Sequence, residues 1–306
     1  MAIINGIIQS YDLVGITEDI SDVITMISPT ATPFQSSIGK EGIHNIVHQW
    51  QEDSLLAVAQ NSAIEGASAP AAVAQNTVMR SNNTQILTAT ASASGTADKV
   101  QKYGRAKELA YQLGRRAAKI KLDLEYIMVG TGQTSVIGND TTARLMSGAQ
   151  ALIGAGTTVN VGSSGAALLP LTEAAWLGLA QTMYNNGAEA KITMIKPNDA
   201  LKVASWQSNP GRTEYVTNGN KTLYNTISVY VSPFSNDGTK FVLNRNLAVT
   251  DALVYDPTMW KVLTLRPWFR KTLAVVGDST NVEIIGEFSL KHKNFGASGR
   301  LKFLAA

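Results

Sequence analysis

The segment from Gln51 to Thr96 constrains the fold of this chain more than any other part of it. The segment contains no aromatic residue and consists largely of Ala, Ser, Thr, Asn and Gln. Ordering one backbone residue costs roughly 1–2 kcal/mol, whereas small side chains bury little apolar area at about 25 cal/mol per Å². The segment is therefore either a disordered linker or an arm that packs on a partner. Its alternation of Thr and Ala, with few Pro and Lys residues, favours the arm.

Charge divides the chain at nearly the same place. Up to Ala97 there are 2 basic and 8 acidic residues, and the remainder holds 24 basic and 15 acidic ones, so the net charge of +3 splits into −6 and +9. Opposite charge on the two parts favours association between copies of the chain. We expect the assembly interface of the front part to include Asp12, Glu18, Asp19, Asp22, Leu55, Val58, Ile64, Glu65, Val73, Ile86 and Leu87.

Composition narrows the class of protein further. The 306 residues suffice for one large or two smaller domains, and the absence of cysteine excludes disulfides and thiolate metal sites. The N-terminus lacks the basic region of a signal peptide, and no run approaches the roughly 20 apolar residues of a membrane span. We expect a protein without a membrane segment that is made in the cytoplasm.

Local patterns predict the elements of the front half. A short helix is expected to begin at Thr17 and to end before the prolines at 29 and 33. Alternation predicts a strand over Ile43–Trp50, and the runs Leu55–Val58 and Gln85–Thr90 are predicted to pair as a hairpin.

The longest predicted element is a helix from Asp98 to Val129, capped by Asp98 and ended by Gly130. At 1.5 Å per residue this helix would be roughly 45 Å long. Its polar side is basic, and the candidate interface residues on it are Lys99, Lys102, Arg105, Arg115, Arg116 and Lys119. A neighbouring subunit, packaged nucleic acid and water are equally good partners for this face on sequence grounds.

The second half alternates short helices and strands irregularly, which predicts an α+β fold. A short helix is expected within 141–153, and Thr172 and Gly187 bracket a second helix. Strands are predicted over 192–195, 226–232, 240–243 and 247–255, with a third helix from Pro197 to Trp206, a turn at 236–238 and further strands over 258–304.

No constellation predicts catalysis or a cofactor. His44, His48 and Glu52 would suit a metal on a helix, but on a strand they share one face with Trp50, which favours packing. His292, between two lysines, is expected at a solvated strand end. The glycine-rich run 130–135 lacks the Gly-Lys-Ser/Thr end of a phosphate loop, and no nucleophile–base pair is evident.

The run Arg266–Lys271 interleaves basic and aromatic side chains, as a binder of single-stranded nucleic acid does. Trp and Arg are also enriched at protein interfaces, and a protein interface is the favoured interpretation of this run. Trp268 and Arg270 therefore complete the predicted interface.

Three short sequence motifs are distinctive: 24–34 (ITMISPTATPF), 48–54 (HQWQEDS) and 104–113 (GRAKELAYQL). In these motifs, and in the order of arm, hairpin, long helix and mixed domain, the chain resembles the major capsid proteins of tailed phages. The resemblance implies the Hong-Kong-97-like fold. It also implies an N-terminal arm over 1–40, an extended E-loop over 41–97, a peripheral domain over 98–134 and 251–294 with the spine helix 98–129, and an axial domain over 135–250 and 295–306.

The resemblance further implies hexamers and pentamers that close into an icosahedral shell around double-stranded DNA bound without sequence specificity. A separate scaffolding protein, a portal and an added cement protein are the implied partners. Some family members crosslink through a lysine on the E-loop, but no lysine lies between Lys40 and Lys99, so no such bond is expected. The alternative is a nucleic-acid-binding structural module that uses the basic helix face.

Overall fold

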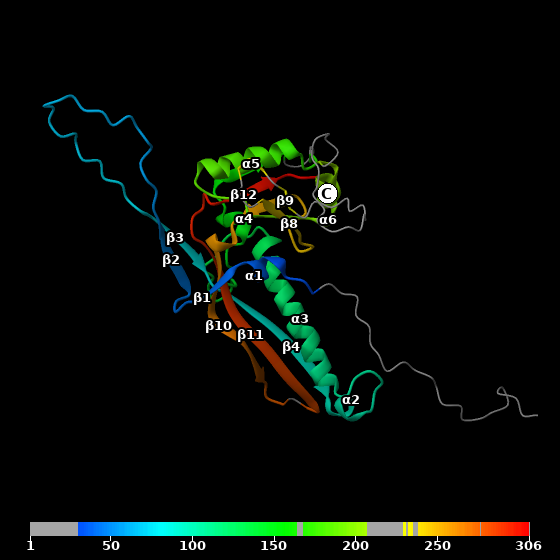
Figure 1. Cartoon of the computed structure of the whole chain (residues 1–306). Helices are drawn as coiled ribbons and strands as arrows, with labels where there is room; N and C mark the ends of the chain where they lie inside the picture. Colours follow the sequence, from blue (N-terminus) through cyan, green and yellow to red (C-terminus); the bar gives the residue numbers. More distant parts are fainter. Residues whose placement is uncertain are drawn as a thin grey trace, which may run out of the picture.

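The computed structural model describes residues 30–163, 168–206, 229–230, 232–234, 238–275 and 277–305. Figure 1 shows an elongated body from which a long hairpin arm projects at one side, formed by β2 (Val47–Glu52), β3 (Val78–Asn83) and the chain between them. The predicted N-terminal helix at Thr17 lies outside the described residues, as do most of the predicted strand 226–232 and of the turn 236–238.

One end of the body is a four-stranded sheet in the order β1-β10-β11-β4. Its strands are β1 (Gly39–Gly42), β4 (Gln85–Ser94), β10 (Trp260–Thr272) and β11 (Ser279–His292). Helix α3 (Glu108–Val129) lies along this sheet, as Figure 1 shows. Short helices α1 (Pro33–Ser37) and α2 (Gly95–Lys99) stand at the entry to β1 and at the end of β4.

The other end is a six-stranded sheet in the order β5-β12-β9-β6-β8-β7. Its strands are β5 (Thr158–Asn160), β6 (Ile192–Ile195), β7 (Val229–Tyr230), β8 (Thr239–Leu243), β9 (Asp251–Tyr255) and β12 (Ser298–Lys302). The helices here are α4 (Ala149–Leu152), α5 (Glu173–Asn185) and α6 (Pro197–Ser205), with 3-10 turns at Ala155–Thr157 and Pro257–Met259.

Strand β9 separates two hydrophobic cores. Side chains alternate between the faces of a strand, and every residue of β9 is buried. Leu253 and Tyr255 belong to the core that also contains Phe34 and α3, whereas Ala252 and Val254 belong to the core around Trp176. A strand covered on both faces is apolar without alternation, which is why its sequence reads as a continuous run.

Several predicted elements of the second half are confirmed. The Thr172 side chain accepts a hydrogen bond from the Ala175 amide and caps α5. Gly187 follows the helix with φ of +79°, a conformation that glycine adopts without strain. Strand β6 and helix α6 begin at the expected residues, while the strand predicted over 247–255 begins only at Asp251.

The predicted start of the long helix is wrong by ten residues. Ser94 caps the short α2 instead, and Gly104 has φ of +73°, which no continuous helix permits. Helix α3 therefore begins at Glu108 and is roughly 33 Å long. Asp98 still serves its N-terminus, because its Oδ1 accepts the Leu109 amide at 3.3 Å across the intervening loop.

The predicted hairpin pairing is also wrong. Strand β2 pairs with β3, with Trp50 opposite Arg80, and the run 55–58 is in no strand. Strand β4 pairs instead with β11 over ten residues, with Ala89 opposite Ile284. A ten-residue ladder in a packed sheet outweighs an isolated hairpin, which is marginal in water. The predicted strand over Ile43–Trp50 correspondingly begins only at Val47.

Candidate assembly surfaces

The arm, defined here as residues 53–77, makes few contacts with its own subunit. Its large apolar side chains are nearly as exposed as in an unfolded chain: Leu55 at 96%, Val58 at 103%, Ile64 at 85% and Val73 at 70%. The two ends of the arm are held together by the Gln75 side-chain amide, which donates to the Ser54 hydroxyl at 3.0 Å. Bare apolar side chains on a projecting segment are typical of a surface that another molecule covers.

The root of the arm, residues 82–84, is fixed in the body by buried polar groups. The Asn82 amide donates to the Leu290 carbonyl at 2.6 Å, and its oxygen accepts the Ser147 amide at 2.8 Å. The Thr84 hydroxyl donates to Glu287 at 2.7 Å. Since buried hydrogen bonds have defined directions, the root sets the direction in which the arm leaves the body.

The carboxylate of Glu287 ties this root to two further segments. Glu287 is buried and accepts hydrogen bonds from Arg144 and, at 2.9 Å, from Arg266 Nε. The Arg144 Nε also donates to the Thr84 carbonyl at 2.7 Å. Sequence reasoning did not identify Glu287, because its partners lie far apart in the chain.

A second contact holds the base of the arm against the body. Glu52 accepts the Phe295 amide at 2.8 Å and the Arg80 Nε at 2.9 Å, and the Arg80 guanidinium lies 4.2 Å from the centre of the Phe295 ring. His48 stacks on the neighbouring Trp50 with ring centres 5.9 Å apart. Burial, with a smaller effect from Lys291, lowers the pKa of His48. Among the residues described, no group of three His, Asp or Glu is placed to hold a metal ion.

The predicted interface residues of the arm region do not share one environment. Leu55, Val58, Ile64, Glu65 and Val73 are exposed on the arm. Ile86, on β4, is half-exposed at 48%. Leu87 is buried in the core beneath α3, so its assignment to a contact with a neighbour is wrong. The acidic Asp12, Glu18, Asp19 and Asp22 lie outside the described residues.

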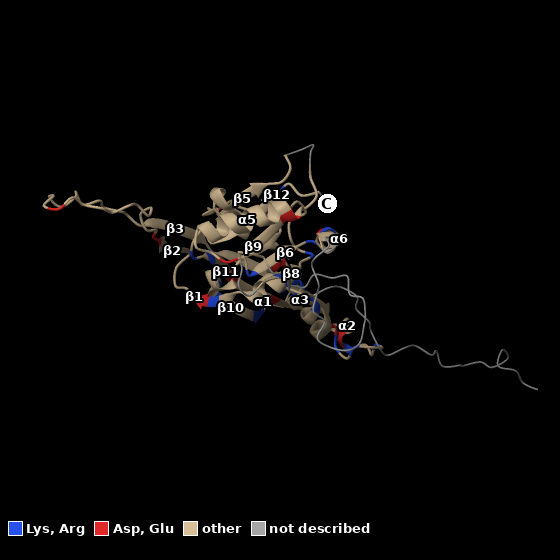
Figure 2. Ribbon diagram, turned by 45° about the horizontal axis from the view of Figure 1, so that its top comes forward, with Lys and Arg blue, Asp and Glu red and all other residues tan. Residues whose placement is uncertain are grey.

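The predicted basic helix face is divided by the loop before α3. Lys99 ends α2, and Lys102 and Arg105 lie in the loop, where Arg105 pairs with Glu108 at 2.7 Å. Arg115 and Arg116 are exposed on α3, and Lys119 pairs with Asp123 at 2.6 Å. Figure 2 shows basic and acidic residues spread over the body, whereas the arm is almost free of charged residues.

The predicted interface strand 266–271 forms the outer half of β10. Trp268 is half-buried and packs on Phe288 with ring centres 4.5 Å apart, while Arg270 is exposed. Strand β1 pairs only with the first half of β10, from Lys261 to Thr264. Along its outer half, β10 therefore has one strand partner, β11, among the described residues.

The N-terminal segment enters the body at a buried carboxylate. Glu125 of α3 accepts the backbone amides of Phe34 and Gln35 at 2.8 and 3.0 Å and the side-chain amide of Asn244 at 2.8 Å. It thereby caps α1, whose own N-cap residue Thr32 provides no side-chain hydrogen bond. Burial raises the pKa of Glu125, and the amide donors partly oppose that rise. Sequence reasoning missed this residue, which falls beside the apolar stripe of the helix.

The prediction of a solvated His292 is wrong. The ring is fully buried and stacks on Trp260, with ring centres 4.0 Å apart. Its Nδ1 lies 2.9 Å from the Leu152 carbonyl, and its Nε2 lies 2.9 Å from the Ser298 hydroxyl, which also accepts the Trp260 indole N–H. This set is satisfied when Nδ1 carries the proton and Nε2 accepts the Ser298 O–H.

Acid is expected to destabilise the subunit through this histidine. Burial lowers the pKa of His292 from 6.5 to about 4. Below about pH 6.5 the unfolded chain binds a proton that the folded chain excludes, so stability falls by about 1.4 kcal/mol per pH unit, or about 3 kcal/mol down to pH 4. In urea unfolding, the difference in stability between the parent and His292→Gln should shrink by about fivefold in equilibrium constant between pH 6.5 and 5.5, because the unfolded histidine is already half-protonated at pH 6.5. A constant difference would contradict the buried neutral ring.

The sequence was compared with models of protein families and with known proteins, and both comparisons match phage major capsid proteins. A sequence model of the family described as SU10 major capsid protein matches residues 7–305. The major capsid protein of Escherichia phage Phieco32 is 31% identical over 342 aligned residues, covering 97% of this chain and 96% of that protein.

Two solved structures extend the comparison to the fold. The capsid of a native GTA particle has a TM-score of 0.68 at 12% identity, covering 97% of this chain and 98% of that one. A chain of the phage G structure of major capsid and decoration proteins has a TM-score of 0.57 at 7% identity, covering 100% of both chains. These likenesses confirm the predicted α+β capsid fold of the Hong-Kong-97-like type.

Proposed function

Because the chain belongs to the SU10 major capsid protein family and is the shell protein of a phage virion, we propose that its subunits assemble as hexamers and pentamers that enclose double-stranded DNA. Heterologous contacts that close by rotation generate rings of this kind. The proposal assigns residues 1–40 to an N-terminal arm, 41–97 to the E-loop, 98–134 and 251–294 to a peripheral domain, and 135–250 and 295–306 to an axial domain.

The exposure of the arm is the observation that carries this proposal. Leu55, Val58, Ile64 and Val73 are 70–103% exposed and so have little cover from their own subunit, and fully burying one such side chain contributes about 1.5–3 kcal/mol. In a closed shell every subunit has a neighbour whose surface can bury these side chains. Many weak contacts then hold the shell together, since each subunit is bound at several places at once.

The role that we propose is structural and not enzymatic. Membership of a capsid protein family supports it. The partners included in the proposal are a separate scaffolding protein, a portal and a decoration protein. The last is supported by the phage G structure, which contains decoration proteins. Within the residues described, no helix is long and apolar enough to cross a membrane.

Electron microscopy of the purified, assembled protein tests the proposal. Closed shells with hexameric and pentameric rings are expected, and discrete monomers at every concentration and salt condition would contradict it. The same shells, boiled in detergent, should give one monomer band on a gel, since no lysine lies between Lys40 and Lys99. A ladder of covalent oligomers would show that the E-loop is crosslinked by other chemistry.

A further inference from the structure

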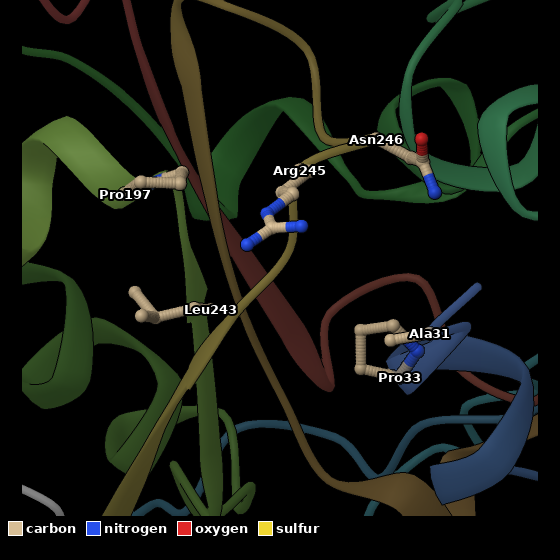
Figure 3. A pocket seen from close by; sticks show the side chains of 6 residues that line it. All are labelled: Ala31, Pro33, Pro197, Leu243, Arg245 and Asn246. Atoms are coloured by element: carbon tan, nitrogen blue, oxygen red, sulfur yellow. The ribbon is translucent and has the colours of Figure 1, made fainter. Parts of the chain in front are cut away.

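A pocket of about 350 Å³ lies beside the point where the N-terminal segment enters the body. Figure 3 shows Ala31 and Pro33 on one side of it, Pro197 and Leu243 on the other, and the side chain of Arg245 between them. Asn246 completes the lining. The pocket thus lies between the N-terminal segment on one side and α6 with the end of β8 and the residues after it on the other. Its walls are mainly apolar.

The charged side chain that lines this pocket is Arg245. Arg245 is exposed and takes part in no ion pair with the residues that the structure describes. The buried acid that caps α1, Glu125, is already engaged by three N–H donors. A guanidinium beside apolar walls is a suitable binding partner for a carboxylate, because it donates to both oxygens and loses little hydration.

The N-terminus of α6 adds positive potential at the same place. Pro197 lines the pocket and is the first residue of this nine-residue helix, whose N-cap residue Lys196 provides no side-chain cap. The Lys196 side chain is itself buried at 7% exposure, and its Nζ makes no hydrogen bond among the described residues. It forms an ion pair with Asp199, whose Oδ2 lies 3.9 Å away in the first turn of the same helix. A helix N-terminus favours an anion, and Arg245 is the cation of this pocket that no described carboxylate neutralises.

We propose that this pocket receives the acidic segment Glu18–Asp22 of a second copy of the chain. The inference rests on the proposed shell assembly and names the receiving site for the N-terminal arm. Residues 1–29 contain four acidic residues and no Lys or Arg. Between the acids stands Ile20, and Val23 follows them, so the segment offers apolar side chains for the walls as well as carboxylates for Arg245.

A second copy fits better than the segment of the same chain. Prolines 29 and 33 each bias the residue before them toward an extended backbone. The short helix predicted from Thr17 to before Pro29 is stiff, and the prolines follow it directly, so the acids of the same chain are not expected to fold back onto a pocket that begins at Ala31. A DNA phosphate fits less well, because binding to the DNA backbone relies on many cations along a surface, whereas this pocket presents apolar walls.

Cysteine crosslinking tests the contact directly, since the chain has no cysteine of its own. Two full-length variants, Asp22→Cys and Arg245→Cys, are mixed, assembled and oxidised, and a disulfide between them can form only between copies. A covalent dimer is expected at least tenfold above the yield of either variant alone. The matched control is Lys240→Cys in place of Arg245→Cys, an exposed cation on β8. Glu18→Cys and Asp19→Cys extend the scan along the segment.

The charge is tested separately in the assembled protein. Arg245→Glu should raise the concentration needed for assembly about tenfold, Arg245→Lys should change it less, and adding Asp19→Lys and Asp22→Lys to Arg245→Glu should restore it. No crosslink at any of the three acidic positions, in shells of normal appearance, would overturn this inference while leaving the proposed function intact. So would a crosslink that forms in a double variant Asp22→Cys/Arg245→Cys but not between the two single variants, or an Arg245→Glu shell that assembles normally and holds less DNA. Absence of shells from the parent protein would instead refute the proposed function.

Discussion

A variant with Leu55, Val58, Ile64 and Val73 all changed to Ser is expected to fold as a subunit and to fail to form closed shells. These side chains are 70–103% exposed in the lone subunit, so their removal costs its folding almost nothing. If a neighbour covers all four, their loss removes about 6–12 kcal/mol of contact per subunit. Even a fraction of that exceeds the 1.4 kcal/mol that changes an association constant tenfold.

Two measurements separate folding from assembly in that experiment. The thermal midpoint of the unassembled subunit should move by less than about 2 °C, because changes at exposed positions are small. Sedimentation and electron microscopy should show no shells at concentrations where the parent protein assembles fully. The matched control replaces Gln60, Asn61 and Asn76, which are polar and exposed on the same arm, with Ser and should assemble normally. Normal shells from the apolar variant would show that the arm is not an assembly surface.

The arm was predictable because its signal is compositional. A stretch with no aromatic residue and few large apolar ones cannot form its own core, whatever its neighbours are. The helix α5 and the strand β6 were predictable for a related reason. A cap at Thr172, a glycine at 187 and a short apolar run act within one turn or one strand, so no distant residue is needed to read them.

The wrong or missed predictions concern residues whose partners lie far away in the chain. Strand β4 pairs with β11, roughly 200 residues further along. The sequence places His292 between two lysines, as at a charged strand end, but in the fold it is buried, and burial keeps the ring neutral while Leu152 and Ser298 satisfy its nitrogens. Glu125 lies on a helix whose period is visible, yet its use as a cap for α1 depends on the fold bringing Phe34 against it. A sequence pattern shows which groups can be buried and does not show which partners will satisfy them.

Replacement of Glu287 by Leu is expected to destabilise the subunit itself by about 3–5 kcal/mol, because it leaves the largely covered guanidinium of Arg144 without its carboxylate. Glu287 joins Thr84 at the arm root to Arg144 and Arg266. Arg266 is 45% exposed at its side chain and can turn to water, whereas Arg144 is 18% exposed and cannot do so readily. Most of the cost should therefore come from Arg144. Urea unfolding of the unassembled variant measures it, with Asp123→Leu on the exposed Lys119 pair as the control that changes stability by under about 1 kcal/mol.

A double substitution identifies the cause of that loss. If an unpaired buried charge is responsible, Glu287→Leu combined with Arg144→Met should be more stable than Glu287→Leu alone, because the second change removes the stranded guanidinium. If the lost attraction is responsible, the double variant should be no better than the single one. Because Arg144 also donates to the Thr84 carbonyl, the double variant should still release the arm root. Hydrogen exchange at residues 82–84 should then be faster than in the parent, even where global stability has recovered, and unchanged exchange there would show that Asn82 alone fixes the root.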